Sequence, residues 1–138
     1  MAKMSVEQRE AFLVTVRLGL LTMLREDGGP TAVPVWFEWD GTAVRVFTGA
    51  ESLKVKRLQR DPRISLLVVN NVGEPEGWVA FDGSVTIKTE GAIELAERLA
   101  ERYWDMADPN YEAVLDSWRH GAANLRVLEL VPEVIRTG

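Results

Sequence analysis

The segment from Val33 to Arg63, VPVWFEWDGTAVRVFTGAESLKVKRLQRDPR, constrains the fold most, because it combines two strand patterns with a helix start. Apolar side chains alternate along the sequence from Val33 to Trp39 and again from Val44 to Thr48, as they do in half-buried strands. Asp40-Gly41 between them is a strong signal for a two-residue hairpin turn. The segment therefore predicts a strand, a tight turn and a return strand before its last part.

The last part of this segment predicts a short helix with an unusual charge. Ser52 suits a helix N-cap, and Pro62 ends a helix that runs to about Arg60. The chain has a net charge of -5, yet the stretch from Ser52 to Arg63 holds one acid, Asp61, and five basic residues. The basic residues are Lys54, Lys56, Arg57, Arg60 and Arg63. Helix N–H groups and the helix dipole favour an anion at such a start, so it is a candidate phosphate site.

Two interpretations of this helix start are compatible with the spacing. In the first, Ser52 only caps the helix and the basic residues form a solvated face. In the second, the hydroxyls of Thr48 and Ser52, the Lys54 ammonium and the first helix amides together hold a phosphate. The spacing differs from that of a Walker-type loop, and the pattern alone leaves both interpretations open.

The rest of the chain predicts further strands and helices that do not alternate. A capping-box pattern at Ser5 and Gln8 precedes the first expected helix. The expected helices are Val6–Thr15, a stripe from Ala92 to Met106, and Tyr111–Arg119. The other expected strands are Leu18–Leu24, Ile64–Val69, Trp78–Thr89 with a bend or bulge at Gly83, and Leu125–Val131. This order predicts a mainly β fold with helices, a mostly antiparallel barrel with appended helices.

Composition narrows the class of protein. A chain of 138 residues is expected to form one domain, 1–138, and 46% hydrophobic residues provide a substantial core. The absence of cysteine excludes disulfides and thiolate metal sites. The acidic balance argues against nucleic acid as the main partner. The start, MAKMSVEQRE, lacks the long apolar run of a signal peptide or membrane anchor, so we expect a cytoplasmic protein without membrane association.

Side chains that carry catalysis are scarce. His120 is the only histidine, and its place near a helix end has a dipole explanation. One histidine without cysteine gives no metal site and no Ser-His-Asp arrangement, so no catalytic residue is assigned. Trp36 and Trp39 are expected on opposite faces of one strand, and Trp78 starts another; such residues most often fill cores or interfaces. With a phosphate site they could flank a planar ligand, which favours a cofactor-driven protein.

The segment VPVWFEWDGTAVRVFTGAESLKVKRLQRDPRISLLVV resembles the flavin-binding split-barrel family related to pyridoxamine 5'-phosphate oxidase. It is most similar to the branch that uses the deazaflavin coenzyme F420. The similarity extends from Leu13 to Val131 and includes LLTMLREDGGP and RVLELVPEVIR, and Val33–Arg63 is its specific part. The resemblance implies a six-stranded antiparallel Greek-key split barrel. It also implies a homodimer with two cofactor sites at the subunit interface.

The resemblance assigns cofactor-binding residues by position. Those expected to hold the phosphate are Thr48, Ser52 and Lys54, with Lys56 and Arg57 as basic positions nearby. Those expected along the ring are Val33, Pro34, Val35 and Trp36. Trp78 stands where the family often has a residue near the cofactor of the opposite subunit. Leu53 stands where arginine is common, and the longer arginine-rich motif of true pyridoxamine phosphate oxidases is missing, which argues against that specific activity.

Three functions follow from the resemblance. The first is an F420-dependent oxidoreductase that passes a hydride between the deazaflavin and a small unsaturated or quinone-like substrate. The second keeps the fold but uses FMN. The third is a non-catalytic protein that binds a flavin, a deazaflavin or a tetrapyrrole. The cations Lys56, Arg57 and Arg60 favour the first function, because F420 has an anionic polyglutamyl tail, whereas FMN needs only a terminal phosphate site.

Overall fold

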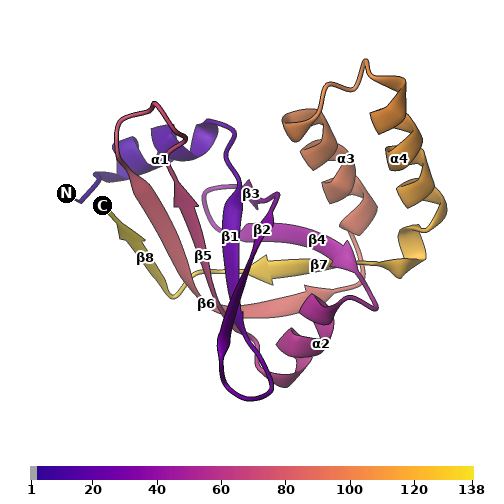
Figure 1. Cartoon of the computed structure of the whole chain (residues 1–138), viewed down its shortest axis with the longest axis horizontal. Coiled ribbons are helices and arrows are strands. Elements are labelled where there is room, and N and C mark those ends of the chain that lie inside the picture. Colours follow the sequence, from indigo (N-terminus) through magenta and orange to yellow (C-terminus); the bar gives the residue numbers. More distant parts are fainter. Residues whose placement is uncertain (1–2) are drawn as a thin grey trace.

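The computed structural model describes residues 3–138, so the first two residues of the predicted domain lie outside the described part (Figure 1). Within residues 3–138 the fold is mainly β with four α-helices. The helices are α1 (Val6–Val14), α2 (Leu53–Arg60), α3 (Ala92–Tyr103) and α4 (Pro109–His120), with a short 3-10 turn at Ala122–Asn124. The strands are β1 (Gly19–Leu24), β2 (Pro30–Val35), β3 (Glu38–Trp39), β4 (Val44–Gly49), β5 (Arg63–Val69), β6 (Trp78–Lys88), β7 (Leu125–Leu130) and β8 (Val134–Thr137). None of these helices is long and apolar enough to cross a bilayer.

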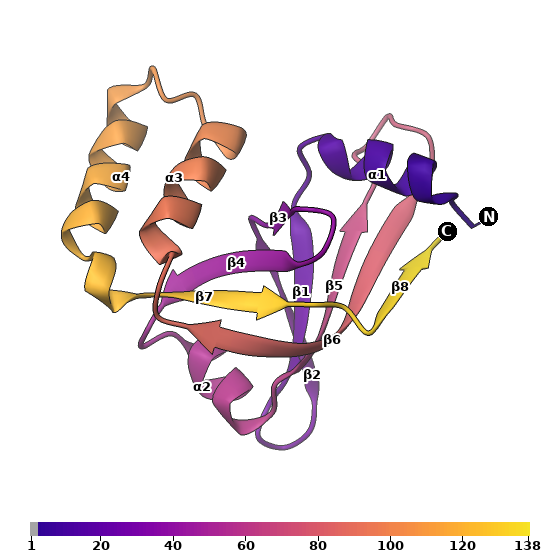
Figure 2. The same cartoon turned by 180° about the vertical axis from the view of Figure 1, so that it is seen from behind.

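The strands form one curled antiparallel sheet in the order β2-β1-β5-β6-β7-β4-β3, with β8 added beside β6. Strand β6 joins its two halves, because residues 78–84 pair with β5 and residues 85–88 pair with β7. Figures 1 and 2 show β4 and β7 crossing the direction of β1 and β5, which leaves a half-open barrel. This agrees with a split barrel. In the described part of the chain the sheet has eight strands, however, where six were expected, because β3 and β8 were not predicted as separate strands.

The change of partner along β6 explains its bend. A Cβ atom at Gly83 would lie 2.8 Å from the Leu130 Cδ1 atom and 3.3 Å from the Glu133 amide nitrogen. Only glycine permits this close approach of the returning chain. Two residues later, the N–H of Val85 donates to the carbonyl of Pro62 at 2.9 Å, outside the β5 ladder. The predicted bend at Gly83 is thus confirmed.

The predicted strand from Val33 to Trp39 is wrong as a single element. It is divided into β2, which pairs with β1, and β3, which pairs with β4. The chain crosses between the two halves of the sheet at Phe37, whose side chain is buried in the core. The Phe37 N–H donates to the Tyr103 hydroxyl at 3.4 Å instead of to a neighbouring strand. The alternating apolar pattern runs unbroken through Phe37, so it gives no sign that the chain crosses there from one half of the sheet to the other.

The hairpin after β3 is present, with its corner one residue later than predicted. Asp40 N–H donates to the carbonyl of Ala43 at 3.3 Å, which places Gly41 and Thr42 at the tip. Gly41 has a φ of 93°, a conformation that favours glycine. The Asp40 carboxylate accepts the N–H groups of Thr42 and Ala43, both at 2.8 Å. The aspartate thus fastens the turn instead of forming its corner.

The main core fills the barrel, and its largest fully buried side chains come from several strands and from the crossing between β2 and β3. They include Leu21, Met23, Phe37, Leu66 and Phe81. Helix α1 lies over one end of the barrel, while α3 and α4 form a hairpin beside β4 and β7, and α2 lies on the other side of these strands (Figures 1 and 2). A second, smaller cluster of buried residues lies between α3 and the sheet. This arrangement leaves β4 with α2 on one side and the helical hairpin on the other.

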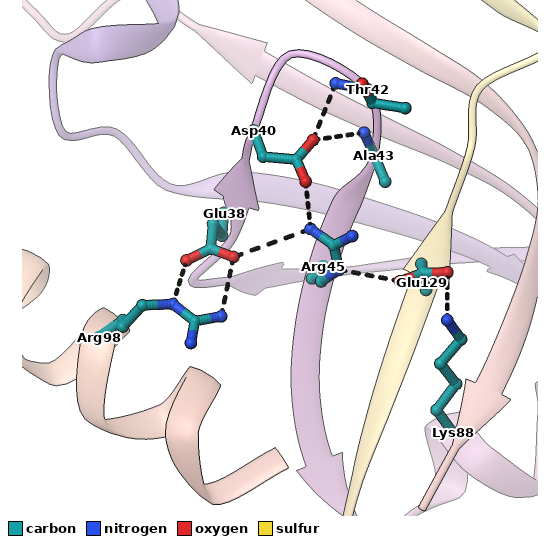
Figure 3. Close-up of polar contacts among 8 residues, drawn as sticks. All are labelled: Glu38, Asp40, Thr42, Ala43, Arg45, Lys88, Arg98 and Glu129. Atoms are coloured by element: carbon teal, nitrogen blue, oxygen red, sulfur yellow. Dashed lines mark hydrogen bonds and ion pairs between the residues drawn. The ribbon is translucent and has the colours of Figure 1, made fainter. Parts of the chain in front are cut away.

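Charged side chains fasten α3 to the sheet (Figure 3). The Arg98 guanidinium of α3 donates to both oxygens of Glu38, at 2.7 and 3.1 Å. Arg45 of β4 lies among three carboxylates: its Nη1 is 2.6 Å from Asp40 and 3.9 Å from Glu38, and its Nε donates to Glu129 at 2.9 Å. Lys88 of β6 completes the series, 2.7 Å from Glu129. We call these residues the charge network; it links α3 to four strands.

Candidate cofactor site

The start of α2 is organised by two hydroxyls. Ser52 is the N-cap, and its Oγ accepts the Val55 N–H at 3.3 Å. The same Oγ accepts the hydroxyl of the buried Thr48 at 3.1 Å. With both bonds accepted, the Ser52 proton has no acceptor among residues 3–138 and is free to donate outward. The predicted cap is confirmed, and Thr48 orients the Ser52 hydroxyl from behind.

Other donors converge on the same helix start. The N–H groups of Leu53 and Lys54 have no partner in the described part of the chain, as is usual for the first turn of a helix. The half-buried Lys54 ammonium forms no ion pair with any residue from 3 to 138. Two free amides, a free hydroxyl, an unpaired ammonium and the positive end of a helix dipole suit an anion such as a phosphate.

A pocket of about 450 Å³ lies beside this helix start. Its volume is in the range that binds small molecules and cofactors. It is lined by Leu18, Pro34, Val35, Trp36, Val46, Phe47, Lys54, Trp104 and Trp118. Eight of the lining residues are apolar or aromatic, and Lys54 supplies the one charge. The structure thus brings four predicted site residues together here: Pro34, Val35, Trp36 and Lys54.

Pro34 and Val35 belong to β2, which lies at the edge of the sheet, and Trp36 directly follows this strand. Pro34 is exposed and pairs in register with Leu20 of β1, and an edge strand tolerates a residue that has no N–H to donate. Side chains alternate along the strand, so Val33 and Val35 share one face. Val35 belongs to the main core and also lines the pocket, whereas Val33 packs against the main core and does not line the pocket. Val33 is a predicted site residue that the structure does not place in the pocket.

Aromatic rings from three elements form one side of the pocket. Trp36 is stacked on Tyr103 of α3, with ring centroids 5.1 Å apart, and meets Trp104 edge-on at 4.6 Å. Trp118 of α4 lies 5.5 Å from Trp104 and 5.2 Å from Phe47 of β4. Burial raises the pKa of Tyr103, whose hydroxyl stays protonated, donates to the Arg17 carbonyl at 2.7 Å and accepts the Phe37 N–H. The cluster is therefore apolar in character.

Trp104 and Trp118 are pocket residues that sequence analysis missed. They are fourteen positions apart, Trp104 directly after α3 and Trp118 within α4, so no local pattern relates them. Their apolar character was the only signal, and it is equally typical of a core or an interface. Only the pairing of α3 with α4 brings both indoles to the edge of Trp36.

The remaining predicted cations lie in a second depression, of about 520 Å³. It is bordered by the β1–β2 turn and the exposed side of α2, and is lined by Arg25, Glu26, Asp27, Leu53, Lys56, Arg57 and Arg60. Lys56 and Arg57 form no ion pair within residues 3–138, whereas Asp27 lies 3.6 Å from Arg25. The depression is therefore basic overall, and Lys56 and Arg57 lie in it instead of in the pocket.

Trp78 is not brought to the pocket by this chain. Its backbone pairs with Gly138, with N···O distances of 3.0 and 3.2 Å, and the Arg136 guanidinium lies 5.9 Å from its ring. A contribution to the site of an opposite subunit stays a prediction. His120 is exposed in the last turn of α4, with Nδ1 2.8 Å from the Asp116 carbonyl oxygen, in keeping with its interpretation as a residue at a helix end.

The curled antiparallel sheet, with its helical hairpin and its pocket beside α2, defines a protein of the split-barrel class. The sequence profile of the pyridoxamine 5'-phosphate oxidase family matches residues 5–137, and the chain belongs to this family. Its members are generally flavin-binding oxidoreductases. The resemblance inferred from the sequence is thus confirmed at the level of the family. No curated protein matched the sequence.

Solved structures confirm the fold. An F420 reductase is 21% identical over 91% of this chain and 94% of that chain, with a TM-score of 0.74. A conserved hypothetical protein from Mycobacterium tuberculosis is 25% identical over 97% of this chain and 84% of that chain, with a TM-score of 0.75. A FAD-binding protein from Mesorhizobium loti is 18% identical over 99% of this chain and 93% of that chain, with a TM-score of 0.65.

Proposed function

We propose that the protein is a coenzyme F420-dependent oxidoreductase that transfers a hydride between the deazaflavin and a small unsaturated organic substrate. One observation carries this proposal: a single pocket combines the flat apolar side of β2 with an unpaired ammonium at the start of α2. A ligand that fits both parts has a planar ring and a phosphate. Membership of the family and likeness to an F420 reductase support the same conclusion.

The residues present fit such a cofactor. Lys54 and Ser52 would hold the phosphate, and Pro34 and Trp36 would lie along the ring. The bound deazaflavin would supply hydride transfer, so the protein need not provide a redox group of its own. The chain would bind and orient the ring, and its aromatic side would exclude water from the reacting face.

The basic depression favours F420 over FMN. Leu53 lines the depression, and Lys54, the next residue of α2, lines the pocket. A phosphate held at Lys54 would place a trailing anionic chain beside Lys56 and Arg57. F420 has such a polyglutamyl tail, and FMN ends at its phosphate. With F420, the polyglutamyl tail would pair with Lys56 and Arg57. With FMN, these two cations would have no anionic group to bind.

A second candidate is a non-catalytic protein that binds a flavin, a deazaflavin or a tetrapyrrole. The observation that favours it is the composition of the pocket, in which Lys54 is the one titratable lining residue. No side chain of the pocket other than Lys54 could deliver a proton to a reduced substrate. An FMN-dependent oxidoreductase of the same fold is the third candidate, supported by likeness to a FAD-binding protein.

We also propose that the protein is a homodimer. Leu18, just before β1, is 50% exposed, Leu20 of β1 is 38% exposed, and Val69 of β5 is 38% exposed. Leu18 lines the pocket, so a partner packed on this surface would border the cofactor site. A specific dimer interface of this kind buries on the order of 1,600 Å² or more. Sedimentation at micromolar concentration should show one species of twice the chain mass, and a clean monomer would contradict the proposal.

Turnover separates these functions. Purified protein is mixed without oxygen with reduced F420 and, separately, with reduced FMN, using menadione as the acceptor. The proposal predicts that the protein accelerates oxidation of reduced F420 well above the rate of the mixture without protein. Acceleration with FMN alone would identify the FMN enzyme. Tight binding of F420 without acceleration for any of several quinone and enone acceptors would favour the non-catalytic protein.

A further inference from the structure

The pocket has two halves of different origin. Lys54 and Pro34 come from α2 and β2, the elements that the proposed function assigns to the cofactor. Trp104 and Trp118 come from the α3–α4 hairpin, which lies on the other side of β4 from α2 (Figures 1 and 2). We call this second part the hairpin half. It has no assigned ligand, although two large aromatic side chains line it.

The hairpin half is held in place from several directions. Arg98 ties α3 to Glu38 of the sheet, as the charge network shows. Arg119, the residue after Trp118, ties α4 to α3 through Glu97 at 3.3 Å. Arg102 donates to the carbonyl groups at the end of α1, among them Val14 at 3.1 Å. The indoles are therefore fixed at the ends of anchored helices, as expected for a preformed binding wall.

Trp118 is the most telling of these side chains. Leu115 is the one fully buried residue of α4. Trp118 is large and apolar but only half-buried, so it does not belong to the buried core. Its ring lies nearly parallel to that of Trp104, with an interplanar angle of 22°, and Trp104 is in turn stacked on Tyr111 at 4.4 Å. Stacked indoles with an open edge offer further stacking to a flat molecule.

We propose that the hairpin half binds the second reactant, a planar uncharged conjugated molecule, and that Trp118 is the specificity-determining residue that limits its size. This deepens the proposed function, on which it rests. The occupant is planar because the wall is aromatic. It is uncharged because this half offers no charged lining residue, Lys54 being placed on α2. Trp118 limits its size because its half-buried indole lines the pocket, where a larger flat molecule would meet it.

Equilibrium binding of two inert probes tests this without turnover. Coumarin has two fused rings and acridone has three; both are flat and uncharged, and calorimetry gives their Kd values. The Trp118→Ala variant should bind coumarin about 2- to 12-fold more weakly, because it loses a stacking partner. It should bind acridone as well as before or better, because the pocket is larger. The ratio of the two Kd values should therefore shift by a similar factor.

Controls keep the result specific. Trp118→Phe retains a ring and should show a smaller shift in the same direction. Val114→Ala alters another exposed apolar residue of α4, outside the pocket, and should leave both Kd values unchanged. Thermal unfolding checks that each variant is folded. Equal weakening of both probes by Trp118→Ala, or the same shift in Val114→Ala, would overturn the assignment of Trp118.

The cofactor separates this inference from the proposed function. Coumarin should still bind the wild type when oxidised F420 is saturating. Displacement of coumarin by F420 would overturn the inference, since the hairpin half would then belong to the cofactor, while the proposed function would stand. A Trp118-dependent probe ratio in a protein that binds no F420 would support the hairpin half as a binding site and contradict the proposed function.

Discussion

Two groups of cations in this molecule behave differently. In the charge network each cation meets at least one carboxylate: Arg45 lies 2.6 Å from Asp40, and Lys88 lies 2.7 Å from Glu129. At the start of α2, Lys54 and Lys56 meet no carboxylate anywhere in residues 3–138. Both groups belong to a chain with an excess of acids, so a shortage of carboxylates does not explain the difference.

This difference in pairing indicates a different role for each group of cations. Paired charges that link α3 to four strands stabilise one arrangement of the fold. Unpaired cations that surround a helix start repel one another in the free protein and attract an anion that the chain itself does not supply. The network is therefore structural, and the α2 cations are assigned to a ligand. Variants from the two groups should separate binding from stability.

The largest expected effect is on binding. Lys54→Ala should weaken F420 binding by roughly 1.5–3 kcal/mol, about 10- to 150-fold, because it removes a charge-assisted bond to the phosphate. Fluorescence titration measures the affinity. The matched control is Lys88→Ala, the same substitution within the network, which should leave the affinity unchanged. Equal affinities for folded Lys54→Ala and wild type would break the comparison.

The next effect is on stability. Arg45→Ala should lower the free energy of unfolding by about 1–2 kcal/mol, because three carboxylates lose their common partner and repel one another. For a chain of this length that corresponds to a fall in Tm of roughly 3–8 °C, measured by circular dichroism. Lys54→Ala should not lower the Tm. A fall in Tm with Lys54→Ala and none with Arg45→Ala would reverse the two roles.

Added salt should weaken the binding of the F420 tail more than the binding of its ring. Lys56, Arg57 and Arg60 are exposed or half-exposed, so salt screens their attraction over a Debye length of about 8 Å at physiological ionic strength. Binding of F420 should therefore weaken with salt more steeply than binding of an F420 analogue that keeps the phosphate but lacks the glutamates. Affinities at several salt concentrations give the two slopes. Identical slopes would leave the α2 cations as a solvated face only.

The smallest expected effect is on thermal stability at low pH. A hydrogen bond from Arg45 and two backbone N–H groups hold the pKa of Asp40 at about 2, below its ordinary value of 3.8. Because the pKa is depressed in the folded state, the stabilisation is complete above about pH 4 and is lost as the pH falls through about 2. The Tm difference between wild type and Asp40→Asn should therefore shrink across this window. A difference that is constant with pH would refute the ionised role of Asp40.

Local signals predicted much of the fold. The Ser52 cap, the bend at Gly83 and the hairpin glycine at Gly41 each depend on backbone chemistry that a few residues determine. The division of the predicted strand at Phe37 could not be predicted in this way. At this point the chain changes its pairing partner from β1 to β4, and the Phe37 N–H donates to Tyr103, sixty-six residues away.

Local sequence likewise predicted only part of the candidate site. Lys54, Pro34 and Trp36 were found because a contiguous segment carries both the strand and the helix start. Trp104 and Trp118 escaped, since their place depends on how two helices pack together. Local sequence thus identified the side of the pocket assigned to the cofactor, and tertiary packing alone supplied the side assigned to the second reactant.

The most direct test of the central claim is a fluorescence titration of the purified protein with three ligands. These are F420, FMN, and the deazaflavin chromophore that lacks both phosphate and tail. The account predicts that F420 binds most tightly and FMN less tightly. It predicts that the chromophore binds most weakly, because the unpaired α2 cations act on phosphate and tail. Tighter binding of FMN than of F420, or equal binding of F420 and the bare chromophore, would contradict the claim.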